Sequence, residues 1–563
     1  MVQSPQKPKR RNLSTLATHF STFYHTFSTH SNPKKQAEKP KQNPIKPEIN
    51  HKYPQLPTNP KIHTFSTAPS RRSALDKTLP GHPPAVYNGG VSDLLTQPAV
   101  ALLELLASKQ ISAAELAELH LERISELNPK LNAIVDFDPD LIRRQARDRD
   151  NQSGERGLLH GLPITIKASI SVVGHRCETG SLLNRNHRPQ HDAESVRRLR
   201  AAGAIVLGTT NCPEFLMAYE TDNNLYGKTN NPWDLTRTSG GSSGGESAAI
   251  SAGLSAAGLG SDGGGSVRTP AHFTGICALK PTPGRIPTTG HLPPPAGPFS
   301  LLGAIGPMAR TIADVTLLFR VTSGASATDP IAAPVFYQPV SAEEAKQTTI
   351  GYLEDDGLTP VTPETRQAVR DAAEALRNQG FRVEPYRPQA LEAARKLWWT
   401  LFVRCGAMLL EPQMLHHEEL MSPTFRNFLD IAHTDPPLTG HEVLSAWAAT
   451  DTVRTALLEE MNNFPILLTP VCSIPAFPHA ERQWTIEGRN INYLDAMRYT
   501  QWFNLLGAPA AVVPVGRSPE GLPIGVQIAG RPWQDERVLA VASALEQSAN
   551  RGFGYAPPSL FHL

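Results

Sequence analysis

Two glycine-rich stretches, separated by a run of small apolar residues, most restrict how this chain can fold. The first is TSGGSSGGES at Thr238–Ser247, and the second is GLGSDGGGSVRTPA at Gly258–Ala271. Sequence rich in glycine and serine is typical of flexible linkers. The segment between the two stretches, however, reads AAISAGLSAAG, which is apolar and favours close packing. We therefore expect the whole block to lie inside a folded domain.

The block contains partial matches to three well-known motifs. Gly258–Gly263 spells GxGxxG, but a dinucleotide fingerprint opens a helix directly, and here Thr269-Pro270 follows almost at once. The stretch GGSSGGES lacks the lysine of a phosphate-binding loop. Gly240–Gly244 matches the GxSxG elbow of α/β-hydrolases, but the preceding NPWDLTRTS is polar where that elbow needs a hydrophobic strand. We expect no nucleotide cofactor, and an esterase that uses Ser242 as its nucleophile stays open as a rival.

The second stretch has the composition that a serine nucleophile needs. A serine hydroxyl requires a base to take its proton, and glycines before it let backbone N–H groups converge on an oxyanion. Ser266 follows three glycines, flanked by Asp262 and Arg268, which form either a buried ion pair that clamps the loop or an ordinary exposed pair. The glycines expected to form the oxyanion hole are Gly263, Gly264 and Gly265.

The base for this serine is not an obvious histidine. His272 lies six residues after Ser266, and a lone histidine is most often structural. Lys167 ends the apolar run LPITIK, and functional residues collect at the carboxyl ends of strands in open α/β sheets. Burial disfavours the charged form of lysine, so a buried Lys167 could act as a neutral base. From the residues alone, a solvated lysine at a strand end is the more common situation.

Hydrophobic patterning predicts an α/β fold. Leu162–Ile166, Asp192–Ala202 and Ala204–Leu207 form a strand, a helix and a strand, and such βαβ units build parallel sheets. A second unit runs from Thr349–Leu353 through a helix opened by Thr362-Pro363 to a strand that starts at Phe381. Further strands are expected at Ala510–Val513 and Ile524–Ile528. An earlier helix begins at Ser112, which has capping-box spacing to Glu115, and Asn128-Pro129 is expected to stop it.

The chain is expected to have one large domain and an unstructured N-terminal segment. Residues 1–80 hold 14 Lys and Arg against 3 Asp and Glu, whereas the rest holds 40 against 49. We expect residues 1–85 to be a disordered, basic Pro/Ser/Thr-rich segment. Residues 86–556 are expected to form the domain, with 385–470 as a more helical excursion, and 557–563 a C-terminal tail. Targeting of the chain to an organelle by its N-terminal segment stays open.

The mildly acidic body argues against nucleic acid as a partner. Five cysteines lie at least 35 residues apart, without metal-ligand spacing, so we expect neither a metal site nor disulfides, and a reducing, cytoplasmic location. No run of 18 apolar residues occurs, which predicts no transmembrane segment. The expected partner is a small molecule, and a homodimer is possible.

Six motifs, in order, resemble the amidase signature family, over about Val91 to Gln547. They are GLPITIK at Gly161–Lys167, GGSSGGES at Gly240–Ser247, GLGSDGGGSVRTPA at Gly258–Ala271, GICALKPTPGR at Gly275–Arg285, GPMARTIADV at Gly306–Val315 and GLPIGVQIAGRP at Gly521–Pro532. The resemblance implies one domain around a mixed, mostly parallel sheet with helices on both faces. It departs from the common family pattern at Ala168, Ser239 and Gly264, none of which removes a catalytic group.

The resemblance also implies a mechanism. Ser266 matches the acylated nucleophile, Ser242 the bridging serine that follows a cis peptide bond, and Lys167 the base. The implied activity is hydrolysis of linear carboxylic amides to an acid plus ammonia or an amine, without a metal or cofactor. The alternative with the same fold is the glutaminase-type subunit of a tRNA-dependent amidotransferase. A non-catalytic binding protein on this scaffold is a third possibility, which the complete triad argues against.

Two segments are candidates for the substrate pocket. TNCPEFLMAYE, at Thr210–Glu220, resembles the fatty-acid amide hydrolase branch more than the tRNA-amidating subunits. It would place an apolar acyl pocket beside the site, and its expected lining is Phe215, Leu216 and Met217. Trp398, Trp399 and Phe402 could line an outer entrance. For both sets, ordinary core packing is the alternative.

Overall fold

The computed structural model describes residues 94–553, all of which belong to one compact unit, His82–Leu563. The predictions for residues 1–85 and 557–563 lie outside the described residues.

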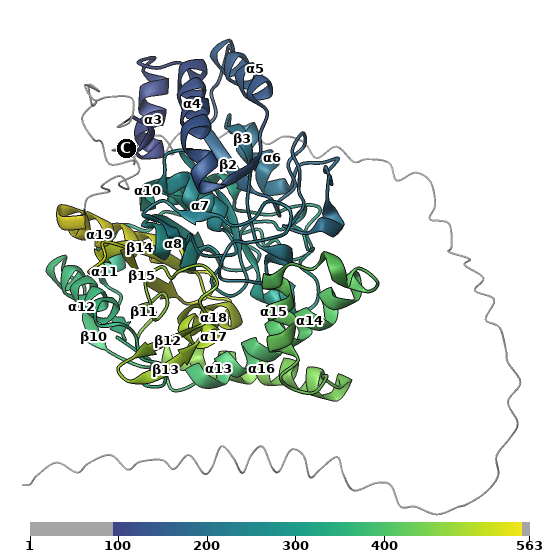
Figure 1. The fold of residues 1–563 in the computed structure, drawn as a ribbon. Helices are drawn as coiled ribbons and strands as arrows, with labels where there is room; N and C mark the ends of the chain where they lie inside the picture. The colour runs from purple at the N-terminus through teal and green to yellow at the C-terminus, as the bar shows by residue number, and fades with distance from the viewer. Residues whose placement is uncertain (1–93, 554–563) are drawn as a thin grey trace, which may run out of the picture. The chain divides into compact units, whose positions relative to one another are not determined.

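An 11-stranded sheet runs through the described part of the chain (Figure 1). Its strands, in spatial order, are β1 (Ile134–Asp136), β3 (Ile205–Thr210), β2 (Pro163–Lys167), β6 (Ala257–Asp262), β8 (Ala304–Ala309), β7 (Cys277–Lys280), β14 (Ala510–Arg517), β15 (Pro523–Gly530), β11 (Ile466–Pro470), β9 (Ile350–Tyr352) and β10 (Val383–Pro385). Two short two-stranded sheets lie outside it, β4 (Asn230–Asn231) with β5 (Asp234–Thr238), and β12 (Gln483–Ile486) with β13 (Arg489–Asn492).

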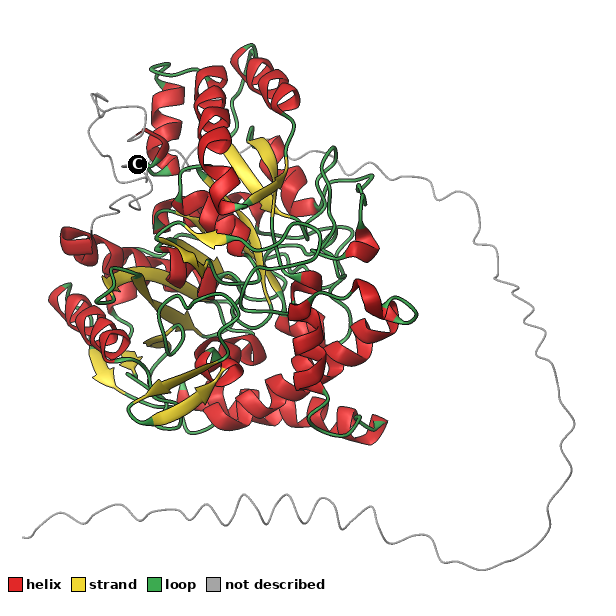
Figure 2. Ribbon diagram, in the orientation of Figure 1, coloured by secondary structure: helices red, strands yellow, loops and turns green. Residues whose placement is uncertain are grey.

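Helices cover the sheet, as the secondary-structure colouring of Figure 2 shows. They are α3 (Ala99–Ala107), α4 (Ala113–Leu131), α5 (Pro139–Asp150), α6 (Glu194–Ala201), α7 (Gly244–Ser251), α8 (Arg268–Thr274), α9 (Pro298–Leu302), α10 (Ile312–Thr322), α11 (Ala342–Lys346), α12 (Pro363–Asn378), α13 (Leu391–Trp398), α14 (Cys405–Leu410), α15 (Pro423–Ala432), α16 (Gly440–Glu460), α17 (Tyr493–Ala496), α18 (Arg498–Leu506) and α19 (Asp535–Phe553). Short single-turn or π-helical segments are η1 (Leu182–Asn184), η2 (Glu214–Leu216), η3 (Trp399–Arg404), η4 (Glu411–Met414) and η5 (Glu418–Leu420).

Strand β14 shows why both faces of the sheet are covered. Its side chains alternate across the sheet. Ala511 and Val513 belong to the large core formed with α4, α10, α12 and α19, whereas Val512 joins a separate cluster with residues of α7 and α8. The expected single α/β domain, with one mixed sheet between two helical layers, is confirmed.

The two predicted βαβ units form the parallel parts of the sheet. Strand β2 pairs in parallel with β3 through the crossover helix α6, and it also pairs in parallel with β6. At the other end, β9 pairs in parallel with β10 through α12, and with β11. The mostly parallel pairing expected from the sequence is found within these two groups of strands. The strands between them pair antiparallel, and the short β14–β15 connection permits no other direction.

Helix α4 corrects one sequence prediction. Its capping box is present, since the Ser112 side chain accepts from the Glu115 N–H and the Glu115 carboxylate accepts from the Ser112 N–H. Asn128-Pro129 does not stop the helix, which continues to Leu131. The stop is Asn132, which takes the left-handed conformation at φ 52° and donates its N–H to the Asn128 carbonyl.

Between β10 and β11 the chain is almost entirely helical. Segments α13 to α16 pack against α18 through a second core, whose larger members include Trp398, Phe425 and Trp502. In Figure 1 these helices lie together beside α17 and α18. This helical insertion, residues 391–460, brings aromatic side chains to one side of the sheet.

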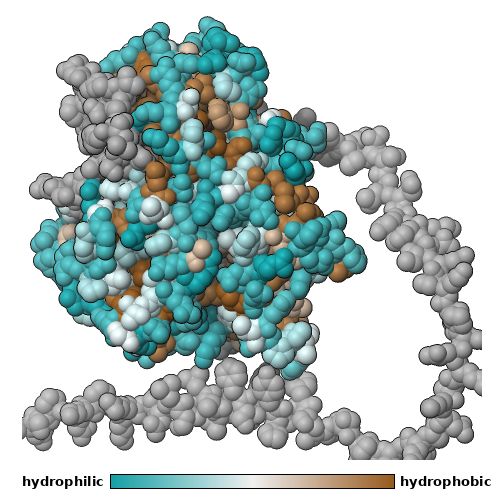
Figure 3. All heavy atoms as spheres, viewed as in Figure 1, coloured by the Kyte–Doolittle hydropathy of each residue, from teal (hydrophilic) through white to brown (hydrophobic). Residues whose placement is uncertain are grey.

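The face of the molecule in Figure 3 is mainly polar. On the face shown in Figure 3, hydrophilic residues cover most of the area, and hydrophobic residues show mostly in narrower areas between them. Among the described residues, no helix combines the length and apolar character needed to cross a bilayer.

Candidate active site

Lys167 lies at the carboxyl end of β2, in the middle of the parallel block. It is fully buried, so the alternative of a solvated lysine is wrong. Its Nζ donates hydrogen bonds to Ser242 Oγ at 2.7 Å and to Ser261 Oγ at 3.1 Å. Burial lowers the pKa of Lys167 to about 8, partly offset by the acidic groups of Asp262 and Glu246. A neutral amine is therefore accessible near neutral pH.

Ser242 lies on the loop between β5 and α7. The Gly241–Ser242 peptide bond is cis, as the family resemblance implies. The loop is tightly packed, because a Cβ on Gly241 would stand 2.5 Å from the Glu220 carbonyl oxygen. The strand before it, β5, pairs with β4 outside the main sheet, so Ser242 does not follow a central strand as a nucleophile elbow would.

Ser266 lies between β6 and α8 and keeps 9% of its surface exposed. The neighbouring Ser243 donates its N–H to the Ser266 carbonyl oxygen at 3.1 Å, which joins the two glycine-rich loops. Ser242 and Ser266 line the same cavity. The structure thus brings the three predicted triad residues to one place, with Ser266 facing open space.

The three glycines before Ser266 are held from both sides. Trp398 Nε1 donates to the Gly263 carbonyl at 2.9 Å, and the hydroxyls of Tyr219 and Thr500 donate to the Gly264 carbonyl. The Gly265 N–H donates to Asp262 Oδ1 at 2.8 Å, so it does not point at a substrate as expected. Its backbone φ of 127° gives the turn that aims this N–H at the carboxylate. Gly263 and Gly264 remain as candidate glycine donors for an oxyanion.

Asp262 and Arg268 form the buried pair that the sequence suggested as a clamp. Both side chains are 0% exposed, and Arg268 contacts both carboxylate oxygens of Asp262, at 2.9 and 3.0 Å. Burial alone would raise the pKa of Asp262, but the Arg268 charge holds it well below its usual range. The Asp262 carboxylate also accepts from the N–H groups of Gly265 and Val267, and therefore fixes the turn that carries Ser266.

Glu246 is a buried carboxyl group that the sequence reasoning did not select. It accepts hydrogen bonds from Thr165 Oγ1 at 2.5 Å and Thr210 Oγ1 at 2.8 Å, and burial raises its pKa to about 8. Thr165 lies two residues before Lys167, on the same face of β2. Glu246 lies in the first turn of α7, four residues after Ser242. The Thr165–Glu246 and Lys167–Ser242 bonds therefore connect the same two segments side by side. The signal available in the sequence was that Glu246 lies within the motif GGSSGGES.

His272 is structural, as expected. One ring nitrogen contacts the backbone of Gly525 and the other lies 3.1 Å from the Ile474 carbonyl.

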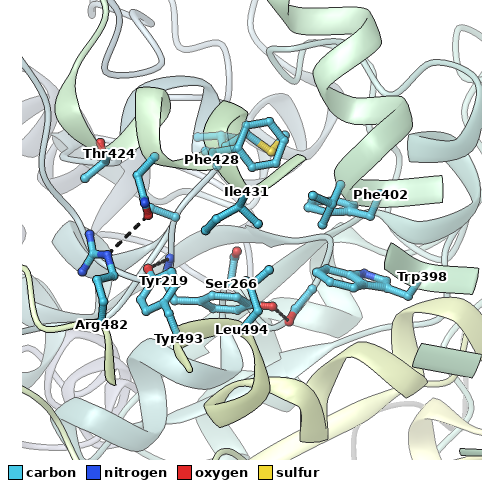
Figure 4. Close-up of a pocket in the computed structure, with 16 residues that line it drawn as sticks. Tyr219, Ser266, Trp398, Phe402, Thr424, Phe428, Ile431, Arg482, Tyr493 and Leu494 are labelled. Atoms are coloured by element: carbon cyan, nitrogen blue, oxygen red, sulfur yellow. Dashed lines mark hydrogen bonds between the residues drawn. The ribbon is translucent and has the colours of Figure 1, made fainter. Parts of the chain in front are cut away.

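Ser266 lines two cavities. One has mainly aromatic and aliphatic walls, and we call it the Trp398 cavity. The other is lined by Ser242 as well, and we call it the Ser242 cavity. Figure 4 shows Ser266 near the centre of the Trp398 cavity, with Trp398 and Phe402 on one side and Tyr219, Arg482 and Tyr493 on the other.

The predicted pocket residues are placed as follows. Leu216 and Met217 line both cavities, whereas Phe215 lines the Ser242 cavity alone. Trp398 and Phe402 also line the site, but Trp399 lines neither cavity and packs against the second core. Sequence reasoning missed the wall residues that come from distant segments, because no motif marks them. They are Thr424, Asn427, Phe428, Ile431, Arg482, Tyr493 and Leu494.

Comparison with known proteins gives relatives of matching length. The chain is 33% identical over 462 residues to an indoleacetamide hydrolase of Bradyrhizobium diazoefficiens, covering 80% of this chain and 86% of that protein. It is 36% identical over 478 residues to a glutamyl-tRNA(Gln) amidotransferase subunit of Roseiflexus castenholzii, covering 79% and 94%. A solved fatty acid amide hydrolase superposes with a TM-score of 0.74 at 25% identity, covering 83% of this chain and 87% of that one. These identities do not single out the fatty-acid amide hydrolase branch expected from the sequence.

The family model described as Amidase matches residues 115–539. This span contains Lys167, both serines and the strands that position them. The chain therefore belongs to the amidase signature family.

Proposed function

We propose that this protein hydrolyses carboxylic amides through an acyl-enzyme on Ser266. The observation that carries the proposal is the 2.7 Å hydrogen bond between buried Lys167 and Ser242, beside Ser266 in one cavity. A lysine whose pKa burial lowers to about 8 supplies a base close to neutral pH. Ser242 then carries the proton between Lys167 and the nucleophile.

The proposed steps balance as follows. Neutral Lys167 takes the Ser242 proton while Ser242 takes the Ser266 proton, and Ser266 Oγ bonds to the amide carbonyl carbon. N–H groups of the Gly263–Gly264 turn stabilise the tetrahedral oxyanion. The proton returns through Ser242 to the leaving nitrogen as the C–N bond breaks. Water, activated by the same relay, then adds to the ester carbonyl and releases the acid and Ser266.

A glutaminase-type subunit is the second candidate, because the Roseiflexus castenholzii relative covers 79% of this chain. The walls of the Trp398 cavity argue against it, since Trp398, Phe402 and Phe428 present apolar surface to whatever lies beside Ser266. Glutamine, with a charged amino group and carboxylate, gains little from such walls.

Ammonia release by the chain purified alone tests the proposal. We expect hydrolysis of phenylacetamide, whose acyl group is apolar, and little or no hydrolysis of glutamine. Hydrolysis of glutamine alone, or only with a second chain present, would favour the glutaminase-type role. An inactive protein under both conditions would contradict the proposal.

A further inference from the structure

Ser266 lies where the two cavities meet. Four residues line both cavities, and they are Leu216, Met217, Ser266 and Phe402. An amide carbonyl bonded by Ser266 Oγ has two substituents, the acyl carbon and the nitrogen, and they leave the carbonyl carbon in different directions. Each substituent can therefore face a different set of cavity walls.

The proton path assigns the two directions. Ser242 lines only the Ser242 cavity and is absent from the walls of the Trp398 cavity. The leaving nitrogen must receive its proton from Ser242, so it must face the Ser242 cavity, and the acyl group must face the Trp398 cavity.

The Trp398 cavity suits an aromatic or branched apolar acyl group. The rings of Trp398 and Phe402 stack with 5.0 Å between centroids, and Phe428, Ile431 and Leu494 add apolar surface. Its one charged wall residue, Arg482, is already engaged by the buried carboxylate of Glu220. This partner reduces the attraction that Arg482 offers to an anionic substrate.

The Ser242 cavity is also built for more than ammonia. Its lining includes the apolar residues Pro293, Pro295, Phe299, Ala304 and Ile305. Its histidine, His291, is neutral, because burial lowers its pKa to about 4. An ammonia leaving group would contact none of these apolar residues, whereas an apolar amine substituent would bury surface against them.

We propose that the preferred substrates are N-substituted amides, with an aromatic or branched acyl group in the Trp398 cavity and an uncharged apolar amine substituent in the Ser242 cavity. This inference rests on the proposed function and adds the substrate class.

Phenylacetamide and N-benzylphenylacetamide test it, because both give the same phenylacetyl enzyme. We expect kcat/KM for the N-benzyl amide to exceed that for the primary amide by about tenfold or more, the scale of apolar discrimination in a pocket. Deacylation, measured as the rate after the burst, should be equal for both. A primary amide that is hydrolysed equally well or better would overturn the inference.

Two matched variants locate the groups. Phe299→Ala and Ile431→Ala each shorten a half-buried apolar residue, in the Ser242 and Trp398 cavities respectively. Phe299→Ala should lower kcat/KM for the N-benzyl amide about tenfold more than it lowers kcat/KM for phenylacetamide. Ile431→Ala should lower both by the same factor. The reverse pattern, or equal effects of Phe299→Ala on both amides, would overturn the assignment. If neither amide is turned over and no acyl-enzyme forms on Ser266, the proposed function itself fails.

Discussion

The end of the sheet that carries the triad and the wall of the Trp398 cavity are built in different ways. Lys167, Ser242 and Ser266 lie on short segments close to β2 and β6, and each is at most 9% exposed. The opposite wall comes from η3, α15 and the segments around β12 and α17. Local hydrogen bonds fix the first region, whereas packing between distant helices fixes the second. The proposed chemistry and the proposed substrate preference therefore have separate structural origins.

The largest expected effect is the loss of activity when the proposed nucleophile is removed, a change confined to the triad region. Ser266→Ala deletes one oxygen from a residue that borders a cavity, so the melting temperature should change little. Amide hydrolysis should fall by at least about 10³-fold, as expected when the nucleophile of a catalytic unit is lost. Steady-state kinetics and thermal unfolding of the same preparation check both statements. A variant that remains active would remove Ser266 from the mechanism.

Breaking the buried Asp262–Arg268 ion pair should lower the free energy of unfolding. Arg268→Met leaves Asp262 as a buried carboxylate without its cation, which is destabilising by about 3–5 kcal/mol. Denaturant unfolding measures the change. Arg143→Met is the matched control, because Arg143 pairs with Glu118 on the surface. It should shift the unfolding midpoint little. Equal effects of the two variants would contradict the clamp.

The pH dependence of activity tests the base. Because catalysis needs neutral Lys167, kcat/KM should rise with pH through a midpoint near the Lys167 pKa of about 8 and fall below it. The titratable groups around Lys167 are Cys212 on the β3 side, Asp262 on β6, Glu246 on α7 and the nearby His291. Only Glu246 combines a direct link to β2 with its own titration in this range.

Glu246→Gln should therefore move that midpoint. The Glu246 anion raises the pKa of Lys167, so a neutral glutamine should shift the rise of kcat/KM to lower pH. Asp314→Asn is the control, since Asp314 is an equally buried carboxyl group on α10 with a raised pKa. It should leave the midpoint in place even if it lowers stability. A uniform loss of activity in Glu246→Gln, without a shifted midpoint, would restrict Glu246 to a structural role.

The smallest predicted effect on kcat concerns Trp398, a wall residue that also contacts the turn before Ser266. Trp398→Phe removes the hydrogen bond to the Gly263 carbonyl but keeps an aromatic ring beside Phe402. Loss of one such bond is worth about 0.5–1.5 kcal/mol, so kcat should fall by about two- to tenfold. Trp502→Phe is the control, because Trp502 Nε1 has no partner in the described part of the chain. It should leave kcat unchanged. Equal kcat values in the two variants would show that the hydrogen bond from Trp398 to the Gly263 carbonyl does not contribute to catalysis.

This contrast also explains what could be predicted from the sequence. The βαβ units around α6 and α12 were predictable because the hydrophobic period, Pro363 at the start of α12 and the glycines Gly203 and Gly380 after the two helices act within a few residues of each other. The triad was recognisable because GLPITIK, GGSSGGES and GLGSDGGGS each place one of its members. Pro129 was misjudged because the helix end depends on Asn132, which can adopt a left-handed conformation.

The pocket walls could not be predicted in the same way. Tyr493 and Ile431 reach the cavity only because α15 and the β12–β13 hairpin pack beside the sheet, and no local pattern reports such a contact. The direction of the Gly265 N–H could not be predicted either, because it depends on the three-dimensional position of the Asp262 carboxylate.

The role of Ser266 is tested most directly by labelling the protein with a serine-directed fluorophosphonate and locating the adduct by peptide mass spectrometry. We expect one adduct, on Ser266, with labelling that becomes faster as the pH rises through about 8. An adduct on Ser242, or no adduct on a folded protein, would contradict this expectation.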